Sequence, residues 1–146
     1  MKFGTKRDPF FVYLWVVILL LINVGFVLPP LITGAATDEW IAMLAFDAVT
    51  CGFLLWLALD IRYVLGEDAL LVRGGMFSSR IPYNQITRIT GKPNIWVGYR
   101  LLFSRDAIEI HYRTGWTGSV IISPENQKLF IEELLRKNDG IRTENL

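Results

Sequence analysis

The sequence predicts a fold of two parts: a hairpin of two transmembrane helices over residues 10–59 and a small β-rich domain over residues 60–140. Three observations predict it. Apolar residues make up 52% of the 146 residues and crowd into the first 60 positions, which argues against one uniform soluble domain. Beyond residue 60, short stretches of alternating apolar and polar residues are separated by turn residues, as in antiparallel strands. The last stretch, from residue 123, carries the start and stop signals of an amphipathic helix.

The two predicted spans cover about residues 10–28 and 40–59. A hydrocarbon core of about 30 Å requires about 20 helical residues, and both stretches meet that length. Two adjacent prolines, Pro29 and Pro30, lack backbone N–H donors, so the first helix is expected to end before them and the chain to turn. The two spans therefore form a helical hairpin in this prediction.

The distribution of Lys and Arg predicts how the hairpin is oriented. Basic residues precede the first span and follow the second, whereas the connecting loop has none. Because flanking Lys and Arg are retained on the cytoplasmic side, both termini are expected there, with residues 1–9 as a cytoplasmic tail. The bases concerned are Lys2, Lys6 and Arg7 on one side and Arg62 and Arg73 on the other.

The first segment also has features of a secretory signal peptide. It has a basic start, and Thr33-Gly34-Ala35 loosely resembles a cleavage site. Its apolar run is longer than the usual 7 to 15 residues of such a signal, and a second apolar segment follows at once. A retained membrane helix is therefore the favoured interpretation.

One ionisable side chain, Asp47, interrupts the second span. A charge in hydrocarbon is costly, so Asp47 is expected to face protein or water. Counted from the outer ends of the spans, Asn23 lies at a similar depth, and Thr50 shares the helix face of Asp47. Two hypotheses follow. Asp47, Asn23 and Thr50 form an intramembrane polar contact between helices or protomers, or Asp47 is a proton or cation relay in a larger assembly.

The β-rich domain is expected to begin directly after the second span. Turn residues at 66–68 and 74–75 separate the first three strands, and residues 84–90 are compatible with either a short helical turn or a strand. These segments predict a small antiparallel sandwich or barrel. The expected strands are 61–65, 69–73, 77–82, 97–103, 107–113 and 119–122.

A helix is expected to cover the open end of this domain. Ser123 can cap it, Pro124 suits its first position, and Gly140 suits a left-handed exit. Phe130, Ile131, Leu134 and Leu135 fall on one face. The tail after it, residues 141–146, is expected to be frayed.

Three segments of this domain resemble a known family. Residues 80–89 (RIPYNQITRI), residues 104–112 (SRDAIEIHY) and residues 121–125 (IISPE), which lead to Phe130 and Leu134, are similar to segments of the bacterial PH-like proteins of the YyaB type. The resemblance covers about residues 61–137 and implies a PH-like fold of seven strands and a capping helix in a bacterial cell membrane. It implies no catalytic residues, and Ala107 stands where a basic residue is expected.

The residues for most catalytic chemistries are missing from the sequence. One His and one Cys cannot supply a structural zinc site, and Cys51 is expected inside a span, far from His111. Gly74-Gly75 lacks the Lys and Ser or Thr of a phosphate-binding loop. The balance of 15 basic and 14 acidic residues argues against nucleic-acid binding. We therefore expect no enzyme, no cofactor and no metal.

Binding to a protein or to a lipid surface is the class of function that remains. Glu67 and Asp68 in the first β-turn repel phosphate, so a specific lipid headgroup is doubtful, although Arg80, Arg88 and other arginines favour an anionic membrane surface. Large rings in loops are typical of contact sites. The predicted function is a membrane-anchored, non-catalytic scaffold with a protein partner or a second copy of itself; the alternative is an accessory subunit of a transport or channel assembly. The candidate aromatic contacts are Trp96, Tyr99 and Trp116.

Overall fold

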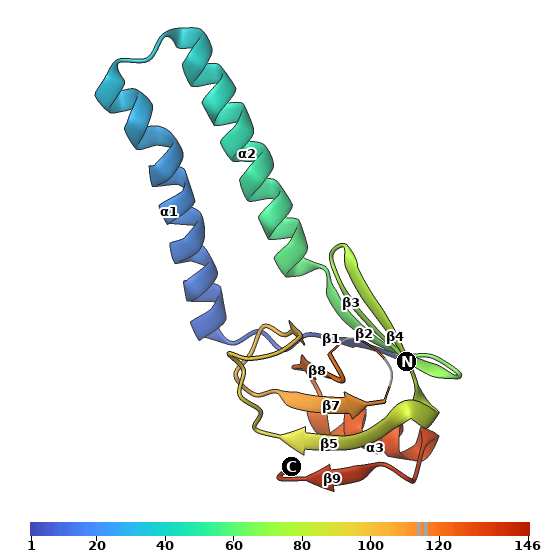
Figure 1. The fold of residues 1–146 in the computed structure, drawn as a ribbon. Helices are drawn as coiled ribbons and strands as arrows, with labels where there is room; N and C mark the ends of the chain where they lie inside the picture. The colour runs from blue at the N-terminus through green and yellow to red at the C-terminus, as the bar shows by residue number, and fades with distance from the viewer. Residues whose placement is uncertain (114, 116) are drawn as a thin grey trace.

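The structure, a computed structural model, describes residues 1–113, 115 and 117–146. Two long helices, α1 (Pro9–Thr33) and α2 (Thr37–Leu59), form an antiparallel hairpin that stands on a β-rich domain with a third helix, α3 (Gln127–Lys137) (Figure 1). Both α1 and α2 are long and apolar enough to cross a membrane by length and composition. Trp116, one of the expected contact residues, lies outside the described residues.

The prediction that α1 ends before its two prolines is wrong. The helix continues through Pro29 and Pro30 to Thr33, and Gly34 ends it in the left-handed conformation with its N–H donated to the Pro30 carbonyl at 3.0 Å. Each proline lacks the N–H that would bond the carbonyl four residues earlier, so α1 loses two backbone bonds and still keeps its helical course to Thr33. The helix α2 begins at Thr37 rather than at 40, and Glu39 accepts the Ala36 N–H at 3.2 Å.

The described strands form two sheets that face each other across the core. The first sheet has the order β1-β2-β3-β4 and is antiparallel throughout; the second has the order β6-β8-β7-β5-β9. Within the second sheet, β7 pairs antiparallel with β5 and β8 as expected for an antiparallel sandwich, whereas β6 pairs with β8 and β5 pairs with β9 in parallel, which was not expected. The strands are β1 (Lys2–Gly4), β2 (Ile61–Leu65), β3 (Ala69–Gly74), β4 (Phe77–Pro82), β5 (Ile86–Gly91), β6 (Arg100–Leu101), β7 (Ile108–Tyr112), β8 (Ser119–Ile122) and β9 (Arg142–Glu144).

Of the six predicted strands, three have the predicted bounds, β3 is one residue longer than predicted, β7 is one residue shorter at each end, and one prediction is wrong. The strands β2, β4 and β8 have the predicted bounds. The ambiguous stretch 84–90 contains both alternatives, since the 3-10 turn η1 (Tyr83–Gln85) leads into β5. Of the strand expected at 97–103, only Arg100–Leu101 pairs, because the exposed Trp96 and Val97 before it have no neighbouring strand.

The first residues are not a tail but part of the domain. Lys2–Gly4 forms β1 against β2, with Phe3 opposite Tyr63. Phe3 is buried and its ring meets the edge of the Phe130 ring at a centroid distance of 5.2 Å. The chain therefore enters the domain before it enters α1 and returns to the domain after α2.

The C-terminal segment also departs from the prediction. The helix α3 begins at Gln127 with Asn126 as its cap, since Ser123 is fully buried and its hydroxyl accepts the Phe103 N–H at 3.0 Å instead. It ends at Lys137, before Gly140. Residues 141–146 are not frayed throughout: Ile141 is buried, and Arg142–Glu144 adds β9 to the edge of β5.

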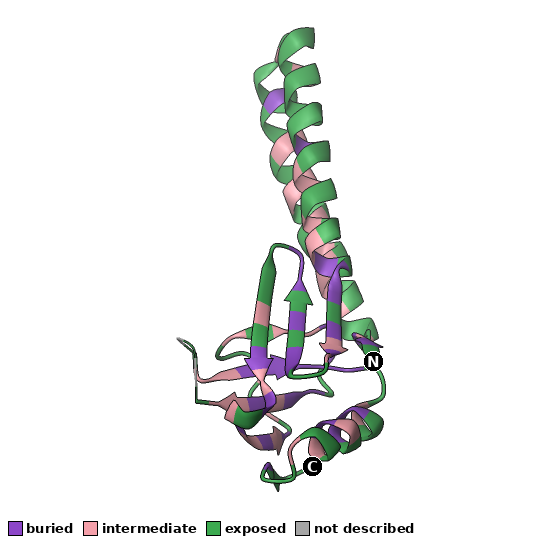
Figure 2. Cartoon of the chain, turned by 90° about the vertical axis from the view of Figure 1, so that its right-hand side faces the viewer, coloured by how far each residue is buried: buried purple, intermediate pink, exposed green. Residues whose placement is uncertain are grey.

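The core lies between the two sheets and α3. Figure 2 shows buried residues concentrated in the strands and in α3, whereas most of the helical hairpin is exposed. The largest of the fully buried side chains are apolar, apart from the hydroxyl of Tyr63. They include Tyr63, Leu70, Ile89, Ile108, Ile110, Ile122, Phe130 and Leu134.

The foot of α1 is fastened to the domain. Asp8 caps the helix by accepting the Phe10 N–H at 3.2 Å and pairs with Arg105 at 3.1 Å. The Phe10 N–H and the Arg105 guanidinium hold the pKa of Asp8 below its ordinary value. The rings of Phe11 and Trp15 lie 6.1 and 6.3 Å from that of Phe103, so α1 is packed against the domain and not loosely tethered to it.

Candidate functional site

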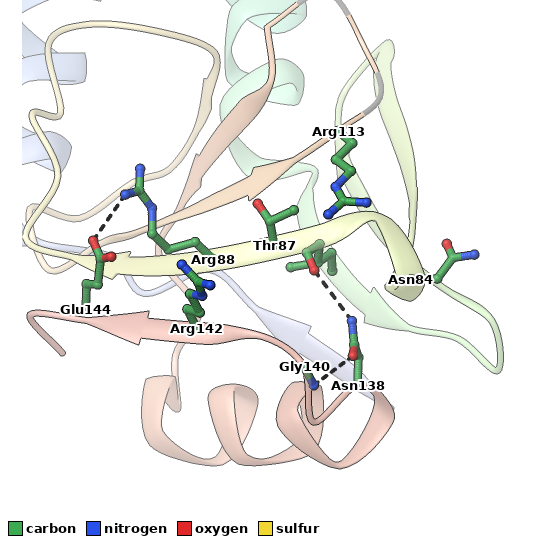
Figure 3. Close-up of a pocket in the computed structure, with 9 residues that line it drawn as sticks. Asn84, Thr87, Arg88, Arg113, Asn138, Gly140, Arg142 and Glu144 are labelled. Carbon is green, nitrogen blue, oxygen red and sulfur yellow. Dashed lines mark hydrogen bonds and ion pairs between the residues drawn. The ribbon is translucent and has the colours of Figure 1, made fainter.

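A groove lies along the edge of the second sheet, between β5, β9 and the turn that follows α3. Its volume is about 580 Å³, and Figure 3 shows the side chains that line it. It lies at the end of the domain farthest from the helical hairpin (Figure 1). The lining residues are Asn84, Ile86, Thr87, Arg88, Arg113, Asn138, Gly140, Arg142 and Glu144.

Asn138 holds the two walls of this groove together. Its amide Nδ2 donates to the Tyr83 carbonyl at 2.7 Å. Figure 3 shows its bonds within the groove, in which Nδ2 also donates to the Ile86 carbonyl at 3.5 Å and Oδ1 accepts the Gly140 N–H at 3.0 Å. The side chain thereby joins η1 to the turn that leads into β9. Directly after this turn, β9 pairs with β5 with Arg142 opposite Arg88.

The groove is basic. Three guanidinium groups line it, from Arg88, Arg113 and Arg142, against one carboxylate, that of Glu144, so the lining carries a formal charge of 3 − 1 = +2. Arg88 pairs with Glu144 at 3.2 Å. Arg113 and Arg142 make no ion pair with any described residue, and the Arg113 backbone N–H is held by the Gln85 carbonyl at 3.0 Å. Such guanidinium forks match carboxylate and phosphate groups.

The structure separates the two arginines that sequence analysis placed together. Arg88 lines the basic groove, whereas Arg80 lies on β4 beside the turn that carries Glu67 and Asp68, in a hollow of about 370 Å³. Arg80 is thus placed among acidic neighbours. Arg88 is the only one of the two with further bases nearby in the described part of the groove.

Two of the expected aromatic contacts can be placed. Trp96 is 60% exposed in the loop between β5 and β6, where its backbone N–H donates to Asn94 Oδ1 at 3.1 Å. Tyr99 is half-buried, and its hydroxyl accepts a hydrogen bond from Ser79 Oγ of β4 at 3.2 Å. Both lie away from the basic groove, so the predicted contact residues do not form one site.

The polar residues of the helical hairpin lie close together. Asn23 Nδ2 donates to Cys51 Sγ at 3.4 Å, and Cys51 Sγ lies 3.6 Å from Asp47 Oδ1. Asp47 is buried, whereas Thr50 donates to the Phe46 carbonyl of its own helix at 2.8 Å. Asn23 and Asp47 are therefore linked through Cys51 rather than directly, and Thr50 forms no bond to α1.

Sequence analysis missed three groove residues, Arg113, Asn138 and Arg142. Arg113 could have been found, since it ends the alternating strand at 107–113. Arg142 lies in the stretch expected to fray, and only pairing of β9 with β5 reveals its position. Among the described residues, no group of three or more His, Cys, Asp or Glu is placed to hold a metal ion.

Comparisons with known proteins agree with this architecture. A family model described as "Bacterial PH domain" matches residues 61–138. The chain is similar to "Uncharacterized protein YyaB" of Bacillus subtilis (strain 168), with 34% identity over 141 residues that cover 97% of this chain and 95% of that protein. The likeness therefore extends over the two apolar helices as well as the domain.

Proposed function

Because this chain belongs to the bacterial PH domain family, we propose that it is a non-catalytic, membrane-anchored binding module that presents the basic groove to an acidic segment of a cytoplasmic protein. The observation that carries the proposal is the groove itself. It brings together Arg113 and Arg142, which have no acidic partner in the described part of the chain, beside Arg88.

Anchoring by α1 and α2 supports a fixed orientation for this groove. The helices have the length of two membrane crossings, and the loop between them lacks Lys and Arg while both of their outer flanks carry them. In this orientation both termini and the domain lie in the cytoplasm. The basic groove then points away from the membrane, because it lies at the opposite end of the domain from the helices (Figure 1).

That direction favours a protein over a lipid as the ligand. A lipid headgroup of the anchoring membrane would have to reach the far end of the domain, whereas a cytoplasmic protein approaches it freely. A segment with several carboxylates or phosphates matches the surplus of guanidinium groups. The exposed edge of β9, with its side chains in solvent, leaves room for an extended segment alongside.

Asp47 is assigned a packing role in this proposal. It is buried against the hairpin with Cys51 as its neighbour, and Cys51 in turn accepts from Asn23 of α1. This chain of contacts joins α1 to α2 within one hairpin, as expected for polar residues that hold membrane helices together.

Neutralising the two unpaired arginines tests the groove. Detergent-solubilised full-length protein is titrated into a fluorescein-labelled peptide of six glutamates, and fluorescence anisotropy reports binding. Arg113→Gln with Arg142→Gln should weaken binding by about tenfold or more, the equivalent of one charge-assisted hydrogen bond. Binding should also weaken with added salt, since the groove is open to solvent.

The matched control is Arg136→Gln, which removes an exposed arginine of α3 that pairs with Glu133 at 2.9 Å, outside the groove. Binding by this variant should equal that of the wild type. An equal loss in both variants would mean that the peptide senses only overall charge, and no loss in either would remove the groove as the site. Displacement of the peptide by short-chain phosphatidylglycerol at equal charge would indicate a lipid ligand instead.

A further inference from the structure

The tip of the β3–β4 hairpin carries two large apolar side chains into solvent. Met76 is 68% exposed and Phe77 is 55% exposed, although they sit at a turn where polar residues are usual. They are adjacent in the chain, so the tip of one hairpin exposes both of them. An exposed apolar surface of this kind marks a contact with another molecule or with a membrane.

This tip lies against the last turn of α2. The Gly75 N–H donates to the Asp60 carbonyl at 3.3 Å, and a side chain at Gly75 would come within 2.5 Å of Leu57 Cδ1. Gly75 also has a φ of +56°, which favours glycine at the turn. The tip is therefore held at the level of the end of α2, as Figure 1 shows, and is not free to swing away.

A layer of charge lies directly beneath the tip. Asp60, which follows α2, is buried and pairs with Arg62 at 2.9 Å and with Arg73 at 3.5 Å. Both guanidinium groups are largely exposed, and Arg73 precedes the tip by one residue of β3. The apolar tip is thus followed by a layer of arginines. The same order of side chains is found where a membrane helix passes from the hydrocarbon core into the headgroups.

A second loop with exposed apolar side chains lies near the foot of the other long helix. The connection from β5 to β6 rises toward the foot of α1 (Figure 1) and exposes Trp96 and Val97. Its end is fixed beside the hairpin, since Tyr99 accepts from Ser79 and the Leu101 side chain lies against Gly74. Tryptophan prefers the boundary between headgroups and acyl chains.

We propose that Met76 and Phe77, with Trp96 and Val97, form an apolar collar that dips into the bilayer around the feet of α1 and α2. The occupant of this surface is the lipid of the anchoring membrane, because the hairpin tip lies against Leu57 of α2, whose last turn also exposes the apolar side chains of Trp56 and Leu59. The collar fixes the domain upright on the membrane and so keeps the basic groove facing the cytoplasm. The inference rests on the membrane anchoring of the proposed function, but not on the ligand of the groove.

Depth-dependent quenching tests the collar in the full-length chain. Cys51→Ser removes the native thiol and keeps a hydroxyl donor near Asp47. Single cysteines are then introduced into this variant and labelled with bimane. The labelled protein is reconstituted into phosphatidylcholine–phosphatidylglycerol vesicles that contain nitroxide-labelled lipids. Phe77→Cys tests the tip and Met76→Cys repeats it. Leu59→Cys at the end of α2 reports insertion, and Leu71→Cys, an exposed apolar position on β3 toward its other end, is the matched control.

The collar predicts that the labels at 77 and 76 lose emission to shallow nitroxides as strongly as the label at 59, while the label at 71 keeps its emission. Quenching at 59 with none at 77 and 76 beyond that at 71 would overturn the collar and leave the anchoring intact. Absence of quenching at 59 would show that α2 does not enter the bilayer, which would contradict both the anchoring and the collar.

Discussion

Phe130→Ala is expected to lower the free energy of unfolding of the domain by about 3–5 kcal/mol, the usual cost of deleting a buried aromatic side chain. Phe130 is fully buried and lies at the junction of three elements. Its ring centroid lies 5.2 Å from that of Phe3 on β1 and 6.4 Å from that of Tyr63 on β2, both edge to face. Its removal leaves a cavity under α3 that these neighbours cannot fill without shifting the N-terminal strand.

Urea unfolding of the full-length protein in detergent, followed by the circular dichroism of the β-rich domain, measures this effect. Leu129→Ala is the matched control, because Leu129 is the adjacent residue of α3 and is 38% exposed. The control should cost less than about 1 kcal/mol. Equal losses in the two variants would show that α3 does not close the core through Phe130.

The elements that could be predicted from the sequence are those fixed by interactions between residues close together in the chain. The strands β2 and β4 were predicted with their bounds because alternation and glycine turns are local signals, written within a few residues. The buried face of α3 was predicted for the same reason, since Phe130, Ile131 and Leu134 recur at helical spacing and are buried. The extent of α1 was not predicted, because the helix continues past its two prolines to Thr33 despite the two backbone bonds that they remove.

The two ends of the chain show what local patterns omit. Lys2–Gly4 and Arg142–Glu144 are too short for any alternation to be recognised, and each becomes a strand only because β2 or β5 offers an open edge. The basic groove depends on the second of these pairings, which brings Arg142 to Arg88 across 54 residues of sequence. Sequence reasoning therefore found one arginine of the site and not the site.

Tyr63→Phe is the second large effect expected in the core, with a loss of about 1–3 kcal/mol, the cost of leaving buried polar groups unpaired. The Tyr63 hydroxyl donates to the Leu101 carbonyl, accepts the Ser123 N–H at 3.2 Å and lies 3.2 Å from the Thr5 hydroxyl. It thus joins β2, β6, the end of β8 and the N-terminal segment. Phenylalanine keeps the ring packing and removes only these bonds.

The same unfolding assay measures this loss. Tyr112→Phe is the matched control, because it removes a hydroxyl bonded to the exposed Thr117 at 3.0 Å rather than a buried one. The control should change the free energy of unfolding by less than about 0.5 kcal/mol. Equal stability of the two variants would show that the buried hydroxyl of Tyr63 makes no net contribution to the free energy of unfolding.

The loss of stability at alkaline pH separates the contribution of the Tyr63 hydroxyl from that of the packing of its ring. Burial raises the pKa of Tyr63 above its ordinary value of 10.0, and the bonds to Thr5 and Ser123 offset this only in part. The folded chain then holds the proton more tightly than the unfolded chain, so the stability that Tyr63 contributes is complete below about pH 10 and is lost as the pH rises through the folded pKa. Burial, and then the Asp68 carboxylate, also raises the pKa of Tyr83, so some alkaline loss persists in the variant. Between about pH 9 and about pH 11 the free energy of unfolding should therefore fall less steeply in Tyr63→Phe than in the wild type, and parallel slopes would contradict a proton held by the fold.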